Sequence, residues 1–421
     1  LINSSKITEN ENAYSYEIRA KIHQGLEEYE EAIQNLDKEM AFKGKKRKGI
    51  FFDLGYCHAN NGNAELSLEY YKKYIENYGL TTSIAQNVGF AFAEKNEYDE
   101  AIEWYDKGLV LNSQHKGILN NKAKSLEILS KFNEAVECYN KILEDEPEDF
   151  WMLNSKGNAL VNAGKFIEGI EVFKQIQSAN TTKDDPPKEM ILNNIGWAMI
   201  KQGEYEKGLE YVEDALKINP NKDYILDSKG QALRSLKKYK EAIKLYEEKY
   251  KLSKNEDDRL WIGICLDILG NIEDNTVEKQ KYYQEAIKIY DLILEITQDD
   301  AFVWYNKAIS LTSIKKYKEA KKNILKAIEM NPNKDIFWDQ LGKISSDEGN
   351  YQQAIICYDK SLKIVTSEVI LHKKANALYN LEKYEEAIDC YDKALEIEFK
   401  IDTITDKGDT LHMMNEYEKA I

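Results

Sequence analysis

The chain has 421 residues, and its 58 Lys and Arg against 74 Asp and Glu give a formal net charge of −16 at pH 7. We therefore expect no nucleic acid partner, since binding to phosphate backbones depends on clustered positive charge. No stretch reaches the roughly 18 uninterrupted apolar residues of a membrane span, so we expect no membrane partner and a cytoplasmic protein.

A small residue recurs along the whole chain, with most successive gaps equal to 34 residues. An aromatic residue stands three positions before nearly every one of these small residues, and another small residue stands twelve positions before most of them. The recurring residues are Ala32, Ser67, Ala101, Ala135, Gly169, Gly208, Ala242, Ala286, Ala320, Ala354, Ala387 and Ala420. We call these twelve positions the marker residues. Regular recurrence of this kind predicts a repeat architecture.

Residues 116–149 show the repeat most clearly. Apolar residues at helical spacing predict two helices with a turn near Lys131, and Pro147 ends the second helix because proline can neither donate nor continue it. A hairpin of about 34 residues cannot bury its own apolar face, so each hairpin needs neighbours on both sides. The pattern therefore predicts an all-α chain of stacked hairpins.

These markers resemble those of the tetratricopeptide repeat family. The Gly or Ala of the first helix, the aromatic residue that opens the second, the marker residue, a tyrosine four residues later and a closing proline such as Pro147 all match. The resemblance covers about eleven full repeats and a twelfth that is cut short at Ile421. It implies an α–α superhelix, or solenoid, in which first helices line a concave groove and second helices lie outside.

Two stretches interrupt the spacing. Residues 177–188 contain Pro186 and Pro187, which forbid helix. We expect this stretch to be a spacer between repeats 1–5 (residues 1–176) and repeats 6–12 (residues 189–421) of one continuous superhelix. Residues 271–281 lengthen the turn of the eighth repeat, and Asn275 with Glu278 resembles a capping pair. A basic run at residues 43–48 is expected to be a solvated loop.

No pattern in the sequence favours catalysis. We find no HExxH, no GxSxG and no phosphate-binding loop, and the five cysteines and five histidines show no metal-ligand spacing. We therefore expect no enzyme activity, no cofactor and no metal site, with the cysteines buried as packing residues.

Asparagine recurs near the small residue of successive first helices, although it is a poor residue for a helix interior. Side-chain amides both donate and accept, so a row of them matches the backbone of a bound peptide. Similar ladders in the repeats of the protein O-linked N-acetylglucosamine transferase imply the same role here. The predicted groove residues are these asparagines together with three aromatic residues. They are Asn87, Asn120, Asn121, Asn154, Asn158, Asn193, Asn194, Trp197, Tyr224, Tyr305, Asn306 and Asn376.

The sequence thus predicts a scaffold that holds an extended or helical segment of a protein or peptide partner in this groove. Two alternatives stay open. The repeats could select substrates for a catalytic domain outside this chain, or they could form a self-assembling array. In the latter, the uncapped last repeat would join copies into a homo-oligomer.

Overall fold

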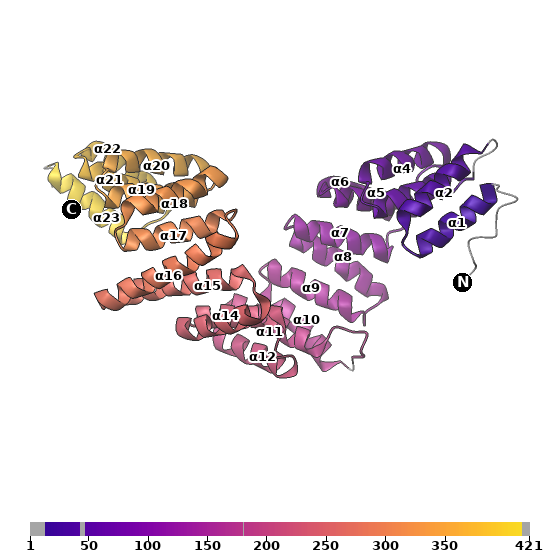
Figure 1. Cartoon of the computed structure of the whole chain (residues 1–421), viewed down its shortest axis with the longest axis horizontal. Helices are drawn as coiled ribbons and strands as arrows, with labels where there is room; N and C mark the ends of the chain where they lie inside the picture. Colours follow the sequence, from indigo (N-terminus) through magenta and orange to yellow (C-terminus); the bar gives the residue numbers. More distant parts are fainter. Residues whose placement is uncertain (1–12, 43–46, 180, 415–421) are drawn as a thin grey trace. The chain divides into compact units, whose positions relative to one another are not determined.

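The computed structural model describes residues 13–42, 47–179 and 181–414, and every regular element in this part of the chain is an α-helix (Figure 1). The all-α class is therefore confirmed. The chain forms two compact units, one ending at Ile225 and the other beginning at Leu226, within α13. The predicted division at residues 177–188 stays a prediction.

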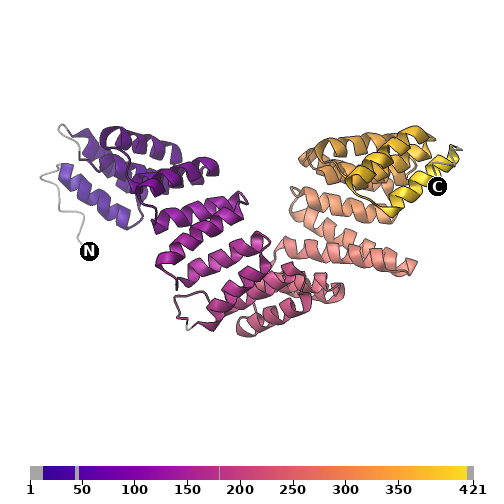
Figure 2. The same ribbon diagram turned by 180° about the vertical axis from the view of Figure 1, so that it is seen from behind.

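The described residues of unit 1 form six helical hairpins, whose helices follow one another in chain order (Figures 1 and 2). Its helices are α1 (Ala13–Gly25), α2 (Tyr29–Ala41), α3 (Ile50–Asn60), α4 (Ala64–Tyr78), α5 (Thr82–Glu94), α6 (Tyr98–Leu111), α7 (Lys116–Ile128), α8 (Phe132–Asp145), α9 (Phe150–Asn162), α10 (Phe166–Ser178), α11 (Lys188–Gln202) and α12 (Tyr205–Ile218).

Unit 2 continues the same order of hairpins, and its last described helix is a first helix. Its helices are α13 (Asp223–Ser235), whose first residues belong to unit 1, α14 (Tyr239–Ser253), α15 (Glu256–Ile272), α16 (Thr276–Ile296), α17 (Ala301–Ser313), α18 (Tyr317–Met330), α19 (Asp335–Asp347), α20 (Tyr351–Ile364), α21 (Glu368–Asn380), α22 (Tyr384–Ile397) and α23 (Ile401–Met413). The predicted second helix of the twelfth repeat, with Ala420, lies outside the described residues.

Glycine in the first helix makes room for a ring of the second helix. A Cβ atom built on Gly89 would lie 2.4 Å from the ring of Tyr105, and one on Gly342 would lie 2.5 Å from the ring of Tyr358. Both tyrosines are buried. This explains the predicted pairing of a small residue with a tyrosine four residues after the marker, since a larger side chain would occupy the space of the ring.

The sixth hairpin packs differently, because its second helix carries Val212 where most other repeats have an aromatic ring. Here the two backbones approach directly, and a Cβ on Gly196 would lie 2.7 Å from the carbonyl oxygen of Gly208. Two glycines facing each other thus replace the glycine–ring contact.

The turn inside ten of the described hairpins contains a residue with positive φ, five positions before the marker residue. Four of these residues are glycines, such as Gly164 at φ +80°, and six have side chains, such as Lys315 at φ +60°. A left-handed residue lets a short turn reverse the chain, and it is strained for any residue with a Cβ.

The spacer before α11 has the predicted local structure, but the expected longer turn at residues 271–281 is wrong, because α15 continues to Ile272, α16 begins at Thr276, and the extra residues lengthen the two helices. No helix covers residues 181–187, and the indole N–H of Trp151 donates to the carbonyl of Asp184 at 2.8 Å, which ties this spacer to α9. Asn275 caps α16, and its side chain accepts from the amides of Val277 and Glu278. The predicted capping role of Asn275 is thus confirmed.

The basic run at residues 43–48 was expected to be a solvated loop, and its arginine, Arg47, differs from this expectation. Arg47 binds Glu39 at 2.9 Å and Asp53 at 2.6 Å, so it joins α2 to α3 instead of lying in solvent. The Glu39 side chain is only 5% exposed, and a buried carboxylate needs such a partner. Residues 43–46 lie outside the described part of the chain.

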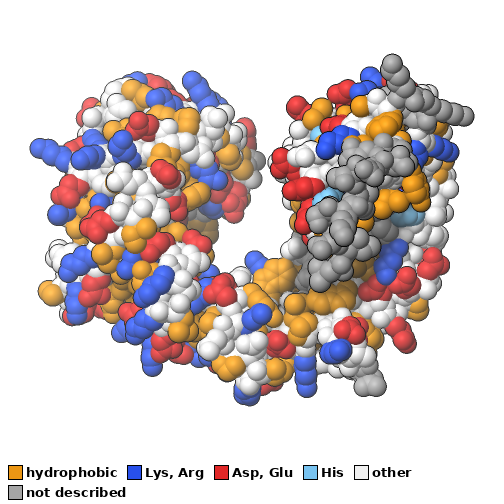
Figure 3. All heavy atoms as spheres, turned by 45° about the vertical axis from the view of Figure 1, so that its right-hand side comes forward, with side chains coloured by type: hydrophobic (Ala, Val, Ile, Leu, Met, Phe, Trp, Pro, Cys, Tyr) orange, Lys and Arg blue, Asp and Glu red, His pale blue; other side chains and the backbone are white. Residues whose placement is uncertain are grey.

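On the face drawn in Figure 3, acidic, basic and hydrophobic side chains are interspersed, and no large area carries one sign of charge alone. All five cysteines are buried, as predicted. Among the described helices, none combines the length and the apolar character that crossing a membrane would require.

Candidate functional site

In each unit the first helices of neighbouring hairpins pack against one another. Neighbouring first helices touch one another, for example α5 with α7, α9 with α11, and α17 with both α15 and α19. Among the described residues, the second helices of neighbouring hairpins do not contact one another to the same extent. We call the surface formed by the first helices the inner wall.

All twelve predicted groove residues lie on first helices. Asn87 is on α5, Asn120 and Asn121 on α7, Asn154 and Asn158 on α9, Asn193, Asn194 and Trp197 on α11, Tyr224 on α13, Tyr305 and Asn306 on α17, and Asn376 on α21. Asn154 and Asn193 are buried, and the other ten are half-buried.

Some inner-wall side chains pair with each other between successive first helices. In unit 1 the amide nitrogen of Asn194 donates to the amide oxygen of Asn154 at 2.8 Å. Asn154 lies three residues before the small residue Gly157 of its helix, and Asn194 lies two residues before Gly196 of the next first helix. We call a pair with this spacing a rung. A rung links neighbouring hairpins and occupies polar groups that a ladder would offer to a peptide.

The same register gives two more rungs in unit 2. Lys373 binds Asp339 at 2.7 Å, and the Nε2 atom of His372 lies 3.1 Å from a carboxylate oxygen of Asp406. Asn376 belongs to the same cluster, because its amide oxygen accepts from the hydroxyl of Tyr391. These groups are satisfied internally.

Asn306 is also satisfied internally, by its own helix. Its amide nitrogen donates to the carbonyl oxygen of Phe302, four residues earlier, at 2.9 Å. The predicted ladder is therefore interrupted at this position by a local hydrogen bond.

Three predicted amides remain available on the inner wall of unit 1. Asn87, Asn121 and Asn158 are half-buried and make no side-chain hydrogen bond to any residue that the structure describes. On neighbouring positions, the amide oxygens of Asn120 and Asn193 are buried without a partner among the described residues. A buried polar atom without a hydrogen-bond partner, such as these two oxygens, is unusual in a folded protein.

The predicted aromatic residues of the inner wall are partly engaged in packing. Trp197 is half-buried against the core of α9 to α11, and the Nζ atom of Lys201 lies 5.7 Å from its ring centroid. Tyr305 packs against Phe337, with ring centroids 5.3 Å apart. Burial raises the pKa of Tyr224, and Glu189 raises it further. All three aromatic residues are half-buried.

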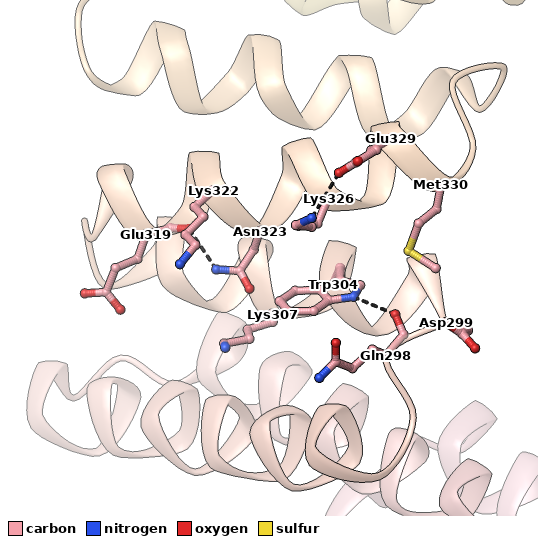
Figure 4. A pocket seen from close by; sticks show the side chains of 10 residues that line it. All are labelled: Gln298, Asp299, Trp304, Lys307, Glu319, Lys322, Asn323, Lys326, Glu329 and Met330. Atoms are coloured by element: carbon pink, nitrogen blue, oxygen red, sulfur yellow. Dashed lines mark hydrogen bonds and ion pairs between the residues drawn. The ribbon is translucent and has the colours of Figure 1, made fainter.

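A cleft of about 670 Å³ lies between the α16–α17 connection, α17 and α18 (Figure 4). The indole N–H of Trp304 donates to the carbonyl of Gln298, and Trp304 points roughly 160° away from Asn306 around the helix. The cleft therefore faces away from the inner wall. Three lysines and three carboxylates line it, so it favours no charge class of ligand. The charged residues are Lys307, Lys322, Lys326, Asp299, Glu319 and Glu329.

Asp267 is a buried carboxyl group that no motif in the sequence singles out. Asp267 accepts from the hydroxyls of Ser310 at 2.6 Å and Tyr290 at 2.7 Å. Burial raises the pKa of Asp267 to about 7, although both hydrogen bonds act in the opposite direction. Within the described residues, no group of three or more His, Cys, Asp or Glu is arranged to hold a metal ion.

Models of the tetratricopeptide repeat match seven segments that together span more than half of the chain. The matched residues are 50–81, 117–149, 190–222, 225–260, 303–334, 337–364 and 369–399. A TPR repeat-containing protein of Methanocaldococcus jannaschii is 29% identical over 100 residues, which is 24% of this chain and 17% of that protein's length.

Among solved structures, the chain resembles the APC/C hetero-tetramer Cut9–Hcn1, with a TM-score of 0.45 and 13% identity over 98% of this chain and 97% of that one. It also resembles Naa15/Naa10 bound to HypK, with a TM-score of 0.37 and 14% identity over 97% of this chain and 74% of that one. MamA from Desulfovibrio magneticus RS-1 gives a TM-score of 0.36 and 18% identity, over 42% of this chain and 96% of that one.

Proposed function

Because the chain belongs to the tetratricopeptide repeat family, we propose that it is a non-enzymatic scaffold whose inner wall holds an extended or helical segment of a protein partner. The family is typical of protein–protein interaction. The proposal adds where the partner binds and which side chains hold it.

The unpaired amides of unit 1 carry the proposal. Asn87, Asn121 and Asn158 lie on three successive first helices, and each offers a carbonyl acceptor and two donors. Peptide backbones present the complementary groups irrespective of sequence. Half-buried amides without an internal partner gain more from such a ligand than solvated ones, because part of their hydration is already lost.

Amides alone do not provide tight binding. At about 1 kcal/mol net for each hydrogen bond, three to five amides offset only part of an association cost of about 4–15 kcal/mol. Apolar anchors must supply the rest, and half-exposed aromatic residues are the usual hot spots of interfaces. Trp197 is the strongest such residue near these amides, because its helix α11 contacts α9, which carries Asn158.

The experiment compares two variants with equal loss of asparagine side-chain volume. Wild type, Asn121→Ala/Asn158→Ala and Asn306→Ala/Asn380→Ala are immobilised and exposed to native cell extract, and captured proteins are quantified by mass spectrometry. Asn380, like Asn306, hydrogen-bonds a carbonyl of its own helix, at 2.7 Å. We expect a specific set of proteins to be lost from the first variant and retained by the second.

Equal capture by all three proteins would refute the assignment to these amides. Far-UV circular dichroism of the variants provides the folding control, since both sets of asparagines lie on helices of the same class.

A further inference from the structure

Arginine is rare in this chain, with four residues among 58 Lys and Arg, and its positions are Arg19, Arg47, Arg234 and Arg259. A guanidinium group differs from an ammonium group by its planar fork of donors, which stacks on rings and binds carboxylates with two bonds. Arg47 and Arg259 bind carboxylates of the chain itself, at Glu39 and Glu256. Arg234 does not.

Arg234 on α13 stacks on Trp261 of α15. Its guanidinium carbon lies 3.6 Å from the ring centroid of Trp261, and that ring stacks in turn on Tyr246, with centroids 6.5 Å apart and planes at 20°. Tyr246 is buried, and burial raises its pKa while Arg234 acts in the opposite direction. Trp261 thus supports the guanidinium from one side, and a hydrogen bond between the Arg234 and Tyr246 side chains adds to its placement.

The guanidinium of Arg234 lacks an anionic partner. No carboxylate in the described part of the chain forms an ion pair with it, and its Nε–H is buried without a hydrogen-bond acceptor. A desolvated charged donor is costly when unpaired. In a chain of net charge −16, where acidic side chains are abundant, the absence of such a partner at this arginine is informative.

We propose that Arg234, held on Trp261, binds a carboxylate group of the partner segment. The inference rests on the proposed function, since it names the chemistry of the ligand, but it concerns unit 2 and not the amides of unit 1. Trp261 lies two residues before the small residue Gly263 of its helix. Asn121 and Asn194 stand at the same position of their own first helices, on the inner wall. The carboxylate comes from an Asp or Glu side chain or from a chain end.

A carboxylate fits better than a phosphate group. Phosphate sites generally gather several cations, because the ligand carries close to two negative charges. Lys249 is already bound at 2.5 Å to Asp227 and at 2.9 Å to Asp258, and it is buried. One guanidinium with a planar fork matches the charge and shape of one carboxylate.

The small number of arginines gives a direct test. In the full chain labelled with ¹⁵N-arginine, the Nε–Hε signal of Arg234 is assigned by its loss in Arg234→Lys. The protein is titrated in 150 mM NaCl with Ac-Ala-Glu-Ala-NH2, Ac-Ala-Gln-Ala-NH2, Ac-Ala-Ala-Ala-OH and inorganic phosphate. We expect a saturable shift with a carboxylate peptide, and binding of the Gln peptide at least about tenfold weaker than that of the Glu peptide.

Saturation by Ac-Ala-Glu-Ala-NH2 identifies a side-chain carboxylate as the source, and saturation by Ac-Ala-Ala-Ala-OH alone identifies a chain end. Trp261→Leu is expected to weaken binding several-fold, because the guanidinium loses its support. An unchanged Arg234 signal with both carboxylate peptides, an equal response to the Gln peptide, or tighter binding of phosphate would overturn the proposal. The Arg19 and Arg259 signals serve as the control, because nonspecific attraction of anions would shift them as well.

The same titration on Asn121→Ala/Asn158→Ala separates the two proposals. A retained Arg234 response in that variant shows that the carboxylate site stands without the amides. An unchanged Arg234 signal of the wild-type protein with both carboxylate peptides, together with retained partner capture by Arg234→Lys, would leave the amide proposal intact and reject this one.

Discussion

Replacing Gly196 with alanine tests how the sixth hairpin is packed. The new Cβ atom would lie 2.7 Å from both the carbonyl oxygen of Gly208 and a methyl group of Val212. The oxygen belongs to the backbone of α12, so relief requires the two helices to separate by several tenths of an ångström. Overpacking of this kind costs about 1–3 kcal/mol, and a rigid backbone neighbour places Gly196 near the upper end.

Alanine also favours helix over glycine by about 1 kcal/mol, so the expected net loss of unfolding free energy is about 2 kcal/mol. Gly25→Ala is the matched control, because a Cβ there meets nothing within 4 Å. It should leave stability unchanged or raise it slightly. Urea unfolding followed by far-UV circular dichroism gives the midpoints, and amide hydrogen exchange in α11 and α12 locates the loss, since repeat arrays need not unfold in one step.

A Gly196→Ala protein as stable as wild type would show that the two helices are not held apart by backbone contact.

Two further predictions concern the turn residues and the buried acid. Lys315→Gly should stabilise unit 2 by about 0.5–1 kcal/mol, because glycine adopts the positive φ of this turn without strain, whereas Lys316→Gly, at φ −85°, should not; midpoints of thermal unfolding compare the two. The raised pKa of Asp267 means that the folded state holds its proton more tightly than the unfolded state does. Its contribution to stability is full below about pH 4, is lost as the pH rises to about 7, and amounts to at most about 4 kcal/mol. Asp267→Asn should remove this part of the pH dependence, and urea midpoints at pH 5 and pH 8 that shift equally in both proteins would contradict it.

The repeat and its helices could be predicted from the sequence because their causes are local. Gly89 and Tyr105 stand at fixed spacing, and the structure places one against the other, as in the other hairpins with this pair. Asn275 caps α16 through groups two and three residues away. Such contacts depend on distances along the chain, which a sequence displays.

The state of each inner-wall amide could not be predicted, because it depends on contacts between hairpins and on the choice of rotamer. Asn194 and Asn121 occupy the same register, yet Asn194 is bound by Asn154 and Asn121 has no partner in the described residues. Asn306, again in this register, turns to its own helix. The same residue type at the same position thus reaches three different states.

Rungs and the proposed partner contacts use the same positions on the first helices. A rung such as Asp339–Lys373 links two hairpins, and its charges would have to leave each other before they could bind a partner. An exchange of this kind gives little net free energy, because one set of polar contacts replaces another. Binding capacity should therefore concentrate where rungs are missing. On this reasoning we expect Asn121 and Asn158 in unit 1, and Arg234 in unit 2, to contribute more to affinity than the paired groups at α19 to α23, although all of them lie on first helices.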